Sequence, residues 1–292
     1  MGILIILSPE DQSENLKKFL KESRESAYFA NLFLQRCFNG ISASYYEVQQ
    51  KIGREVVLTT RRNIQQQFHG ELLSIGQLLD PKKPVLFAFD MDSTVIRQEV
   101  IDELARHHGV YDAVAQVTEE AMQGNLDFTE ALDKRCSLLK GLTSEGFSIV
   151  YKKLTFQPGI IDLFAYLHEK GSKIAIYSGG FVPILEKVAQ QYPITHYAAN
   201  HLEIQDGVLT GKVLGEIVDK EKKRELLLKH RELHGVAREQ SVAIGDGSND
   251  SLMLQEAGIG IGFHAKQGLK NKITNWIDTM PHSVFRFLFI ES

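Results

Sequence analysis

The sequence has little cysteine, and its two cysteines form no recognisable motif. Cys37 and Cys136 lie far apart, and neither belongs to a CxxC pair. This pattern indicates neither a disulfide framework nor a zinc site. Long hydrophobic runs are also missing, since none approaches the ~20 apolar residues that a membrane-spanning helix needs. We therefore expect a cytoplasmic protein with no membrane partner.

A strong excess of charge is missing as well. The 292 residues carry a formal net charge of -4 at pH 7, with both signs mixed along the chain. Such a balance gives no reason to expect nucleic acid or an anionic membrane as a partner, and it favours a small molecule. With 43% hydrophobic residues, the chain is long enough to bury a full core and to form more than one domain.

The sequence shows no internal repeat and no low-complexity tract, so turn residues supply the useful boundary. The stretch DPKKP, residues 80–84, separates two different patterns. Before it, residues 2–7 have the pattern of a strand, residues 11–23 that of a helix, and residues 26–38 and 41–48 that of two strands around an Asn-Gly turn. Residues 1–80 are predicted to form a small α+β domain.

After this boundary, strand patterns alternate with helix patterns, which is typical of a doubly wound α/β sheet. The core is predicted to comprise residues 81–96 and 155–292. Residues 97–154 interrupt the alternation with successive helical patterns, and we expect a helical cap inserted after the first core strand. Such an insert lies over the carboxyl ends of the strands, where doubly wound folds bind ligands. Residues 202–215 contain Asp-Gly between alternating apolar residues and predict a projecting hairpin.

Three predicted core strands end in polar residues that suit phosphate chemistry. Asp90 and Asp92 follow VLFAF, Ser178 follows KIAIY, and Asp246 follows SVAIG. Parallel strands bring these ends together, and carboxylates this close stay ionised only if a cation shares them. Mg²⁺ is the predicted ion, because it prefers oxygen ligands and is held by one or two carboxylates together with substrate phosphate.

Each of these residues can be given a chemical task. Asp90 at the strand tip would be a nucleophile that forms an aspartyl-phosphate. Asp92, two residues later, would protonate the leaving alkoxide and then deprotonate the attacking water. Ser178 and the backbone at Gly179 and Gly180 would approach the phosphoryl oxygens at a helix amino end. Asp246 would hold the metal from the opposite strand, and a lysine of DKEKKRE, Lys223 or a neighbour, would supply a fixed positive charge.

Each motif also has a simpler interpretation. A lone Asp-x-Asp after a strand is usually a helix cap or a turn, SGGF can be a hinge, and EKK is commonly a solvated helix face. The stretch DGSND lacks the glycine and glutamate that a calcium-binding EF-hand loop needs at the corresponding later positions. GIGIGF lacks the spacing of a dinucleotide site. The combination of motifs carries the prediction.

In order and spacing, DMDST, YSGGF, a following lysine and GDGSND resemble the four motifs of the haloacid dehalogenase (HAD) superfamily of phosphatases. More closely, residues 92–109, 119–141, 198–213 and 243–254 resemble the phosphoserine phosphatases of that superfamily. The resemblance implies a magnesium-dependent hydrolase of O-phospho-L-serine that acts last in serine biosynthesis. It extends from Val85 to about Lys272 and leaves the first 79 residues and the carboxyl-terminal tail without an assigned role.

The resemblance also implies roles for individual residues. Asp90 matches the nucleophile and Asp92 the acid/base. The metal ligands match the Asp90 side chain, the Asp92 backbone carbonyl and Asp246. The residues that match substrate contacts are Glu99 for the ammonium, Arg135 for the carboxylate, Met122 and Phe128 covering the pocket, and Ser178, Gly179, Lys223 and Asn249 around the phosphate. Asp250 matches an acidic position that supports Lys223 or a bound water.

Two other functions stay open at this point. The same chemistry could serve phosphothreonine, another small phosphoester or an alcohol acceptor. A non-catalytic phosphoacceptor or regulatory protein would also place an aspartate beside magnesium, although it needs neither Asp92 nor a helical cap. Residues 1–80 could form an amino-acid-binding module of the ACT type or a homodimer contact, and only part of the βαββαβ order of such modules is recognisable in the sequence.

Overall fold

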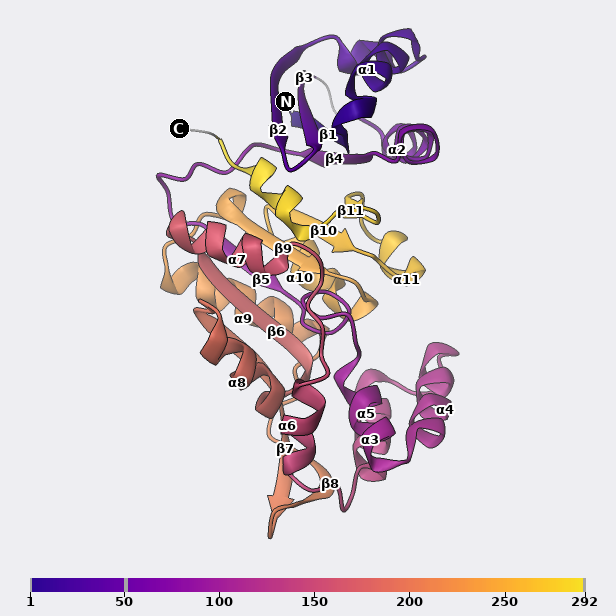
Figure 1. Ribbon diagram of the computed structural model, residues 1–292, viewed down its shortest axis with the longest axis vertical. Coiled ribbons are helices and arrows are strands. Elements are labelled where there is room, and N and C mark those ends of the chain that lie inside the picture. Colours follow the sequence, from indigo (N-terminus) through magenta and orange to yellow (C-terminus); the bar gives the residue numbers. More distant parts are fainter. Residues whose placement is uncertain (1, 50–51, 291–292) are drawn as a thin grey trace.

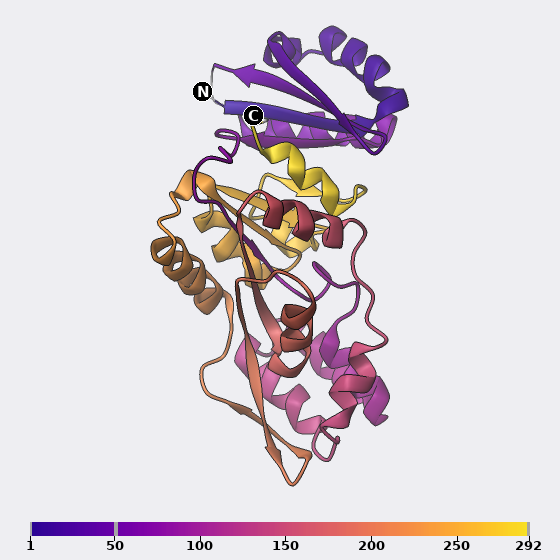
Figure 2. The same ribbon diagram turned by 60° about the vertical axis from the view of Figure 1, so that its left-hand side comes forward.

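The computed structural model describes residues 2–49 and 52–290, which form two β-sheets and a helical lobe arranged along one long axis (Figure 1). A seven-stranded sheet lies in the middle, a four-stranded antiparallel sheet lies at the amino-terminal end, and the helical lobe lies at the opposite end (Figure 2). The predicted α/β class with a small additional amino-terminal sheet is confirmed. Within the described residues, no helix is long and apolar enough to cross a membrane.

The large sheet has the strand order β11-β10-β9-β5-β6-β7-β8. All neighbouring pairs are parallel except β7 and β8, which form the predicted hairpin. The strands are β5 (Leu86–Phe89), β6 (Lys173–Phe181), β7 (His196–Gln205), β8 (Val208–Leu214), β9 (Ser241–Gly245), β10 (Ile259–Phe263) and β11 (Trp276–Ile277).

Strand β5 lies at the centre of this sheet because each of its residues is apolar and both of its faces are covered. Phe87 and Phe89 pack on one face with α7 (Ile160–Glu169) and α8 (Val182–Gln191). Leu86 and Ala88 pack on the other with α9 (Lys220–Leu233) and α10 (Ser251–Glu256). A continuous apolar run of this kind is expected for a parallel strand buried on both faces.

The order of strands in the large sheet changes direction at β5. From β5 the chain continues to β6, β7 and β8 on one side, and it then returns to β9 on the other side of β5. Ligands of doubly wound sheets bind at such a switch point, outside the carboxyl ends of the strands. Residues that directly follow β5 and β9 therefore lie at the place where a ligand is expected.

Four consecutive helices follow β5 and form the lobe at the far end of the molecule (Figure 1). They are α3 (Val100–His108), α4 (Tyr111–Met122), α5 (Phe128–Leu138) and α6 (Glu145–Tyr151). Helix α5 begins at Phe128 because Asp127 caps it: Asp127 Oδ1 accepts a hydrogen bond from the Glu130 amide at 2.8 Å, and Glu130 Oε2 accepts one from the Asp127 amide at 3.0 Å.

The amino-terminal sheet has the full βαββαβ order of a split βαβ unit. Its elements are β1 (Gly2–Pro9), α1 (Ser13–Glu22), β2 (Leu32–Phe38), β3 (Ile41–Val48), α2 (Arg54–Phe68) and β4 (Glu71–Ile75), with strand order β2-β3-β1-β4. The predicted hairpin turn is present, because Asn39 and Gly40 both have positive φ angles between β2 and β3. Helices α1 and α2 cover one face of the sheet.

The carboxyl-terminal segment covers the other face of this sheet, a role that its sequence did not reveal. The 3-10 helix η5 (His282–Leu288) lies between the two sheets (Figure 1). Tyr45 of β3 donates its hydroxyl to the Phe287 carbonyl at 2.8 Å, and Arg36 of β2 donates to the Phe289 carbonyl at 2.6 Å. A short β-bridge between Leu79 and Phe289 also joins the inter-sheet linker to this segment.

Arg61 makes a second contact between the two sheets and allows a test of it. From α2 it donates to the carbonyls of Trp276 and Thr274 at 2.6 and 2.8 Å, and it lies 3.8 Å from Glu71 with both side chains buried. Arg61→Met leaves Glu71 without its nearest cation and is expected to lower the free energy of unfolding by about 3–5 kcal/mol.

Urea unfolding measures this effect, and Arg62→Met is the matched control because Arg62 is exposed. A decrease for Arg61→Met no larger than that for Arg62→Met would mean that Arg61 does not tie the sheets together.

Candidate active site

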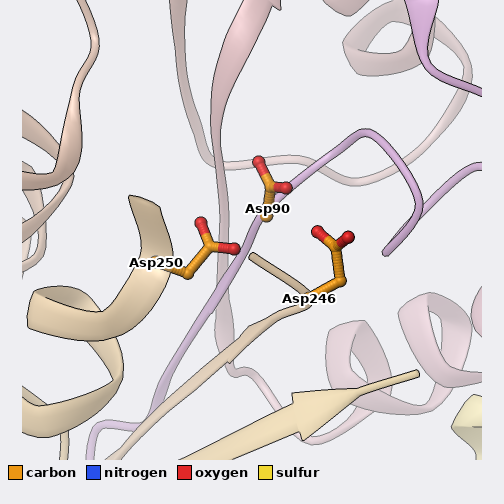
Figure 3. Close-up of side chains that lie close together, drawn as sticks. All are labelled: Asp90, Asp246 and Asp250. Atoms are coloured by element: carbon orange, nitrogen blue, oxygen red, sulfur yellow. The ribbon is translucent and has the colours of Figure 1, made fainter. Parts of the chain in front are cut away.

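Asp90 and Asp246 lie side by side because they directly follow two neighbouring parallel strands. Asp90 follows β5 and Asp246 follows β9, and the Asp90 amide donates to the Ile244 carbonyl at 2.8 Å. Both residues are buried, with 4% and 3% of their surface exposed. Figure 3 shows their carboxylates directed toward a common space, as the strand-end pattern predicted.

Lys223 links Asp90 to a further carboxylate, Asp250. The Lys223 Nζ atom lies 2.6 Å from Asp90 Oδ1 and 2.6 Å from Asp250 Oδ1, and the lysine is fully buried. Burial alone would lower the pKa of Lys223, but the carboxylates of Asp250 and Asp90 outweigh burial and hold this pKa above its usual value. The ammonium group is therefore a fixed positive charge at the tip of β5.

The position of Asp250 depends on a glycine at the end of β9. A Cβ atom on Gly245 would lie 2.5 Å from Asp250 Oδ2, which no side chain at that position could accommodate. The Gly247 amide donates to the same oxygen at 3.0 Å, so the turn after β9 and the Asp250 carboxylate stabilise one another. Asn249, in the same turn, is half-buried. Of the residues predicted from DGSND, Asp246 directly follows β9, and Asn249 and Asp250 lie in the short 3-10 turn that comes next, η4 (Ser248–Asp250).

Asp92 lies where the core meets the helical lobe. Its Oδ2 atom accepts a hydrogen bond from the Val100 amide, at the start of α3, at 3.3 Å. Its Oδ1 atom is buried and has no hydrogen-bond partner among the described residues. Burial, with the negative charge of Glu99, holds the pKa of Asp92 well above its ordinary value. A carboxyl group whose pKa is raised in this way keeps its proton to higher pH and can act as a general acid.

The SGGF motif forms an irregular part of β6. The strand continues through Phe181, beyond the predicted end at Tyr177, and its register with β7 shifts between Tyr177 and Phe181. The Gly180 amide donates to Ser178 Oγ at 2.9 Å, and a Cβ atom on Gly180 would lie 3.2 Å from Asp92 Oδ2. This bulge brings Ser178 and the two glycines close to the acidic cluster. The backbone can approach Asp92 this closely because Gly179 and Gly180 have no side chains.

Asn200 supports this bulge and was missed by the sequence analysis. Its side chain on β7 is buried, donates to the Gly179 carbonyl at 2.8 Å and accepts from the Val218 amide at 2.9 Å. It therefore joins the bulge of β6 to the segment that leads into α9 and Lys223. The available signal was a polar amide in the middle of an otherwise strand-like stretch, AANHLE.

The helical lobe brings two of its predicted residues to the core. Phe128 lies over the bulge, since a Cβ atom on Gly179 would be 3.2 Å from Phe128 Cζ. Glu99 accepts a hydrogen bond from Ser93 Oγ at 2.9 Å. Arg135, seven positions after Phe128 on α5, shares its face of the helix. Burial raises the pKa of Asp102 on α3, and the positive charge of Arg135 opposes this increase. The Arg135 Nε atom donates to the Ala131 carbonyl at 3.2 Å.

Met122 is not brought to the cluster in this conformation. It lies at the carboxyl end of α4 with 83% of its surface exposed. Its predicted place in the pocket therefore stays a prediction that no contact of this structure supports.

Lys266 is the second residue that the sequence analysis missed. Its Nζ atom lies 2.9 Å from Asp246 Oδ2 and 3.1 Å from Glu99 Oε1. It lies shortly after β10, the neighbour of β9, but does not directly follow the strand as Asp246 does, so the strand-end pattern gave a weaker signal for it. A cavity of about 510 Å³ opens at this point and is lined by Ser93, Arg97, Gln157, Pro158, Asp246, His264 and Lys266.

The cluster suits a divalent cation. One oxygen from each of Asp90, Asp246 and Asp250 can be chosen so that all three lie within 4.8 Å of one another. The ammonium groups of Lys223 and Lys266 contact the four carboxylates of Asp90, Asp250, Asp246 and Glu99, so the carboxylates outnumber the ammonium groups. The partnerless Asp92 Oδ1 points to the same conclusion. Hard oxygen donors of this kind fit Mg²⁺ or a similar ion.

Comparison with known proteins agrees with this geometry. Residues 87–255 match the family model of haloacid dehalogenase-like hydrolases. A phosphoserine phosphatase from Streptococcus thermophilus is 45% identical over 181 residues, which cover 62% of this chain and 84% of that enzyme. One from Archaeoglobus fulgidus is 41% identical over 186 residues, which cover 64% of this chain. The match spans only 54% of that longer archaeal enzyme.

A solved structure resembles almost the whole chain. The crystal structure of a HAD-family hydrolase from Salmonella enterica serovar Typhi superposes with a TM-score of 0.87 at 28% identity, covering 99% of this chain and 99% of that one. The resemblance therefore includes the small antiparallel sheet as well as the large sheet.

The protonation of Asp246 predicts how pH changes the response to a metal. Burial raises the pKa of Asp246 to about 6, despite the opposing charge of Lys266. The folded protein therefore holds a proton that the unfolded chain releases near pH 4. This contribution to stability is complete below the unfolded pKa and is lost as the pH rises through about 6. Because Mg²⁺ needs the ionised carboxylates, it competes with this proton.

We expect Mg²⁺ to raise the thermal unfolding midpoint more at pH 7.5 than at pH 5, relative to EDTA. At a concentration of 100 times the Kd, the ion adds about 2.7 kcal/mol to the stability. Asp246→Asn, the control, is expected to show little response to Mg²⁺ at either pH. An equal increase at both pH values in the unmodified protein would contradict this assignment.

Proposed function

The chain belongs to the family of haloacid dehalogenase-like hydrolases, and from this premise we propose that it is a magnesium-dependent phosphatase that converts O-phospho-L-serine to L-serine and phosphate. The observation that carries the chemistry is the meeting of Asp90 with Lys223 at a sheet switch point, with Asp92 and Asp246 beside them. The substrate is inferred from the relatives that are named phosphoserine phosphatases.

Asp90 is proposed as the nucleophile. One oxygen of its carboxylate is held by Lys223 at 2.6 Å, which leaves the other oxygen to attack phosphorus. Without a cation, burial and the charges of Asp250 and Asp246 hold the pKa of Asp90 well above its usual range, with Lys223 opposing them. A bound Mg²⁺ would supply the remaining positive charge, which would keep this carboxylate ionised and offset the charge of the phosphoryl oxygens. Asp90, Asp246 and the Asp92 backbone carbonyl would hold it.

Asp92 is proposed as the acid and base of the two displacements. Its raised pKa gives it a proton for the serine oxygen when Asp90 forms the aspartyl-phosphate. The carboxylate that remains can take a proton from the water that hydrolyses this intermediate and releases phosphate. Its hydrogen bond from the Val100 amide fixes the carboxyl group at the entrance to the helical lobe.

Ser178, the Gly179 amide and Lys223 are proposed to bind the phosphoryl oxygens. The bulge of β6 offers a backbone without side chains, and Asn200 fixes it through the Gly179 carbonyl. Asn249 enters from the turn after β9, next to Asp250. Donors that are fixed before the reaction stabilise developing charge without reorganisation.

Residues 97–154 are proposed to form the cap that selects an amino acid. Glu99 would face the ammonium group, and Arg135 would face the carboxylate with two parallel hydrogen bonds. Phe128 over Gly179, together with Met122, would exclude water from the pocket once substrate closes the cap. Because Met122 is exposed in this conformation, its role requires α4 to move.

The function of the amino-terminal sheet stays a prediction. Its complete βαββαβ order, of which only a part was recognisable in the sequence, supports the proposal of an ACT-like module. Strand β2 is an edge strand that exposes 41% of Leu32 and 51% of Phe33, which supports self-association through this edge.

Two neighbouring lysines provide a matched test of the catalytic assignment. Lys223→Met removes the cation between Asp90 and Asp250, and we expect kcat for phosphoserine to fall by about 10²–10³. Lys222→Met is the control, because among the described residues the Lys222 ammonium group forms ion pairs only with Glu216 and Glu225. Phosphate release measures both, and circular dichroism verifies that each variant is folded.

Similar rates for the two lysine variants would contradict the role of Lys223. Phosphate release that persists in EDTA or in Asp90→Asn would contradict the proposed mechanism as a whole. A protein that becomes phosphorylated without turnover would instead support the phosphoacceptor hypothesis.

Arg135→Ala tests the substrate. Loss of a bidentate contact to the serine carboxylate is expected to lower kcat/KM for phosphoserine by about 10²-fold, the equivalent of two charge-assisted hydrogen bonds. The value for p-nitrophenyl phosphate, which has no such carboxylate, is expected to fall far less. Equal losses on both substrates would exclude the proposed recognition of an amino acid.

A further inference from the structure

Lys266 joins the core to the helical lobe at the edge of the proposed active site. Its ammonium group lies 2.9 Å from Asp246 Oδ2, at the end of β9, and 3.1 Å from Glu99 Oε1, at the start of α3. The proposed catalytic course gives this lysine no step. It is nevertheless a cation within contact distance of a residue that is proposed to recognise substrate.

The backbone of Lys266 is fixed on both sides. Its amide donates to the Asp246 carbonyl at 2.8 Å, and its carbonyl accepts from the Leu269 and Lys270 amides at 2.9 and 3.1 Å. Lys266 is thereby the N-cap residue, directly before α11 (Gln267–Lys270). A long side chain that extends from so constrained a backbone has a limited range of positions for its ammonium group.

Within the part of the chain that the structure describes, the Glu99 carboxylate is held through one of its two oxygens. Oε1 accepts from Ser93 Oγ at 2.9 Å and contacts Lys266 at 3.1 Å. Oε2 accepts no hydrogen bond from the described residues. Two donors from the core therefore orient the carboxylate while the second oxygen is left for another donor.

We propose that Lys266 is a positioning residue for substrate specificity: it holds Glu99 against the core so that Glu99 Oε2 faces the ammonium group of an amino-acid phosphoester. This inference rests on the proposed function and adds to it a residue outside the family motifs noted in the sequence. The contact between Lys266 and Glu99 is expected to strengthen the binding of a zwitterionic substrate more than that of a phosphoester without an ammonium group. Only the zwitterion has an ammonium group for Glu99 to bind.

The ion pair is half-exposed, with 59% of the Lys266 and 40% of the Glu99 side chain accessible. Pairs this exposed contribute modestly, so a change of about fivefold in KM is the appropriate scale. We expect Lys266→Met to raise KM for phosphoserine by about fivefold with a smaller change in kcat, and to change KM for p-nitrophenyl phosphate less. Lys266→Arg, which keeps the charge, is expected to restore most of the affinity.

Two further measurements separate positioning from a general structural effect. In a Glu99→Gln background, Lys266→Met is expected to add little to KM for phosphoserine, because the group it orients is already altered. Calorimetric titration with Mg²⁺ is expected to show no loss of metal affinity in Lys266→Met. Lys272→Met, an exposed lysine just beyond α11, is the control for removal of a positive charge.

Several results would overturn the inference. A fall in KM for phosphoserine would mean that Lys266 occupies the place of the substrate ammonium. Equal losses on both substrates, or weakened Mg²⁺ binding, would mean that it acts through Asp246. Full additivity with Glu99→Gln would mean that the two residues act independently. An unmodified protein that does not hydrolyse phosphoserine would refute the proposed function instead, which is a distinct outcome.

Discussion

The structure depends on the electrostatics of one buried ammonium group among carboxylates. Lys223 is fully buried and contacts both Asp90 and Asp250. Removing three charges from water costs several kcal/mol for each ion, and only close pairing compensates for that cost. The pairing succeeds here because the end of β5, the turn η4 and helix α9 bring these three side chains into contact. Even so, the carboxyl groups outnumber the ammonium groups. All of these carboxyl groups can be ionised together only when a further cation binds.

The fold and the acidic cluster could be predicted because they follow from local patterns. An apolar run followed at once by aspartate places that aspartate at a strand end, and parallel pairing then brings Asp90 and Asp246 together. Lys223 could be chosen over its neighbours only through the family resemblance. The structure supplies a reason, since Lys223 is buried and Lys222 lies on the surface.

Other parts depend on distant contacts that no local pattern encodes. Asn200 holds the bulge of β6 from the next strand, and its partners lie 21 and 18 residues away in sequence. Lys266 meets Glu99 across 167 positions. The sequence of the carboxyl-terminal segment has no clear helical or strand periodicity, because its apolar residues pack between two sheets and do not form one helical stripe. The exposure of Met122 depends on the position of the lobe, which composition does not determine.

The location of η5 between the sheets has a consequence for how the polypeptide matures. During translation the βαββαβ unit leaves the ribosome before η5, yet residues of η5 and the segment after it cover the apolar face that carries Tyr45. Until then this face is bare and open to unwanted association, while α1 and α2 already shield the opposite side. This face of the small sheet is thus covered only after η5 has been synthesised, although the four strands precede η5 in the chain.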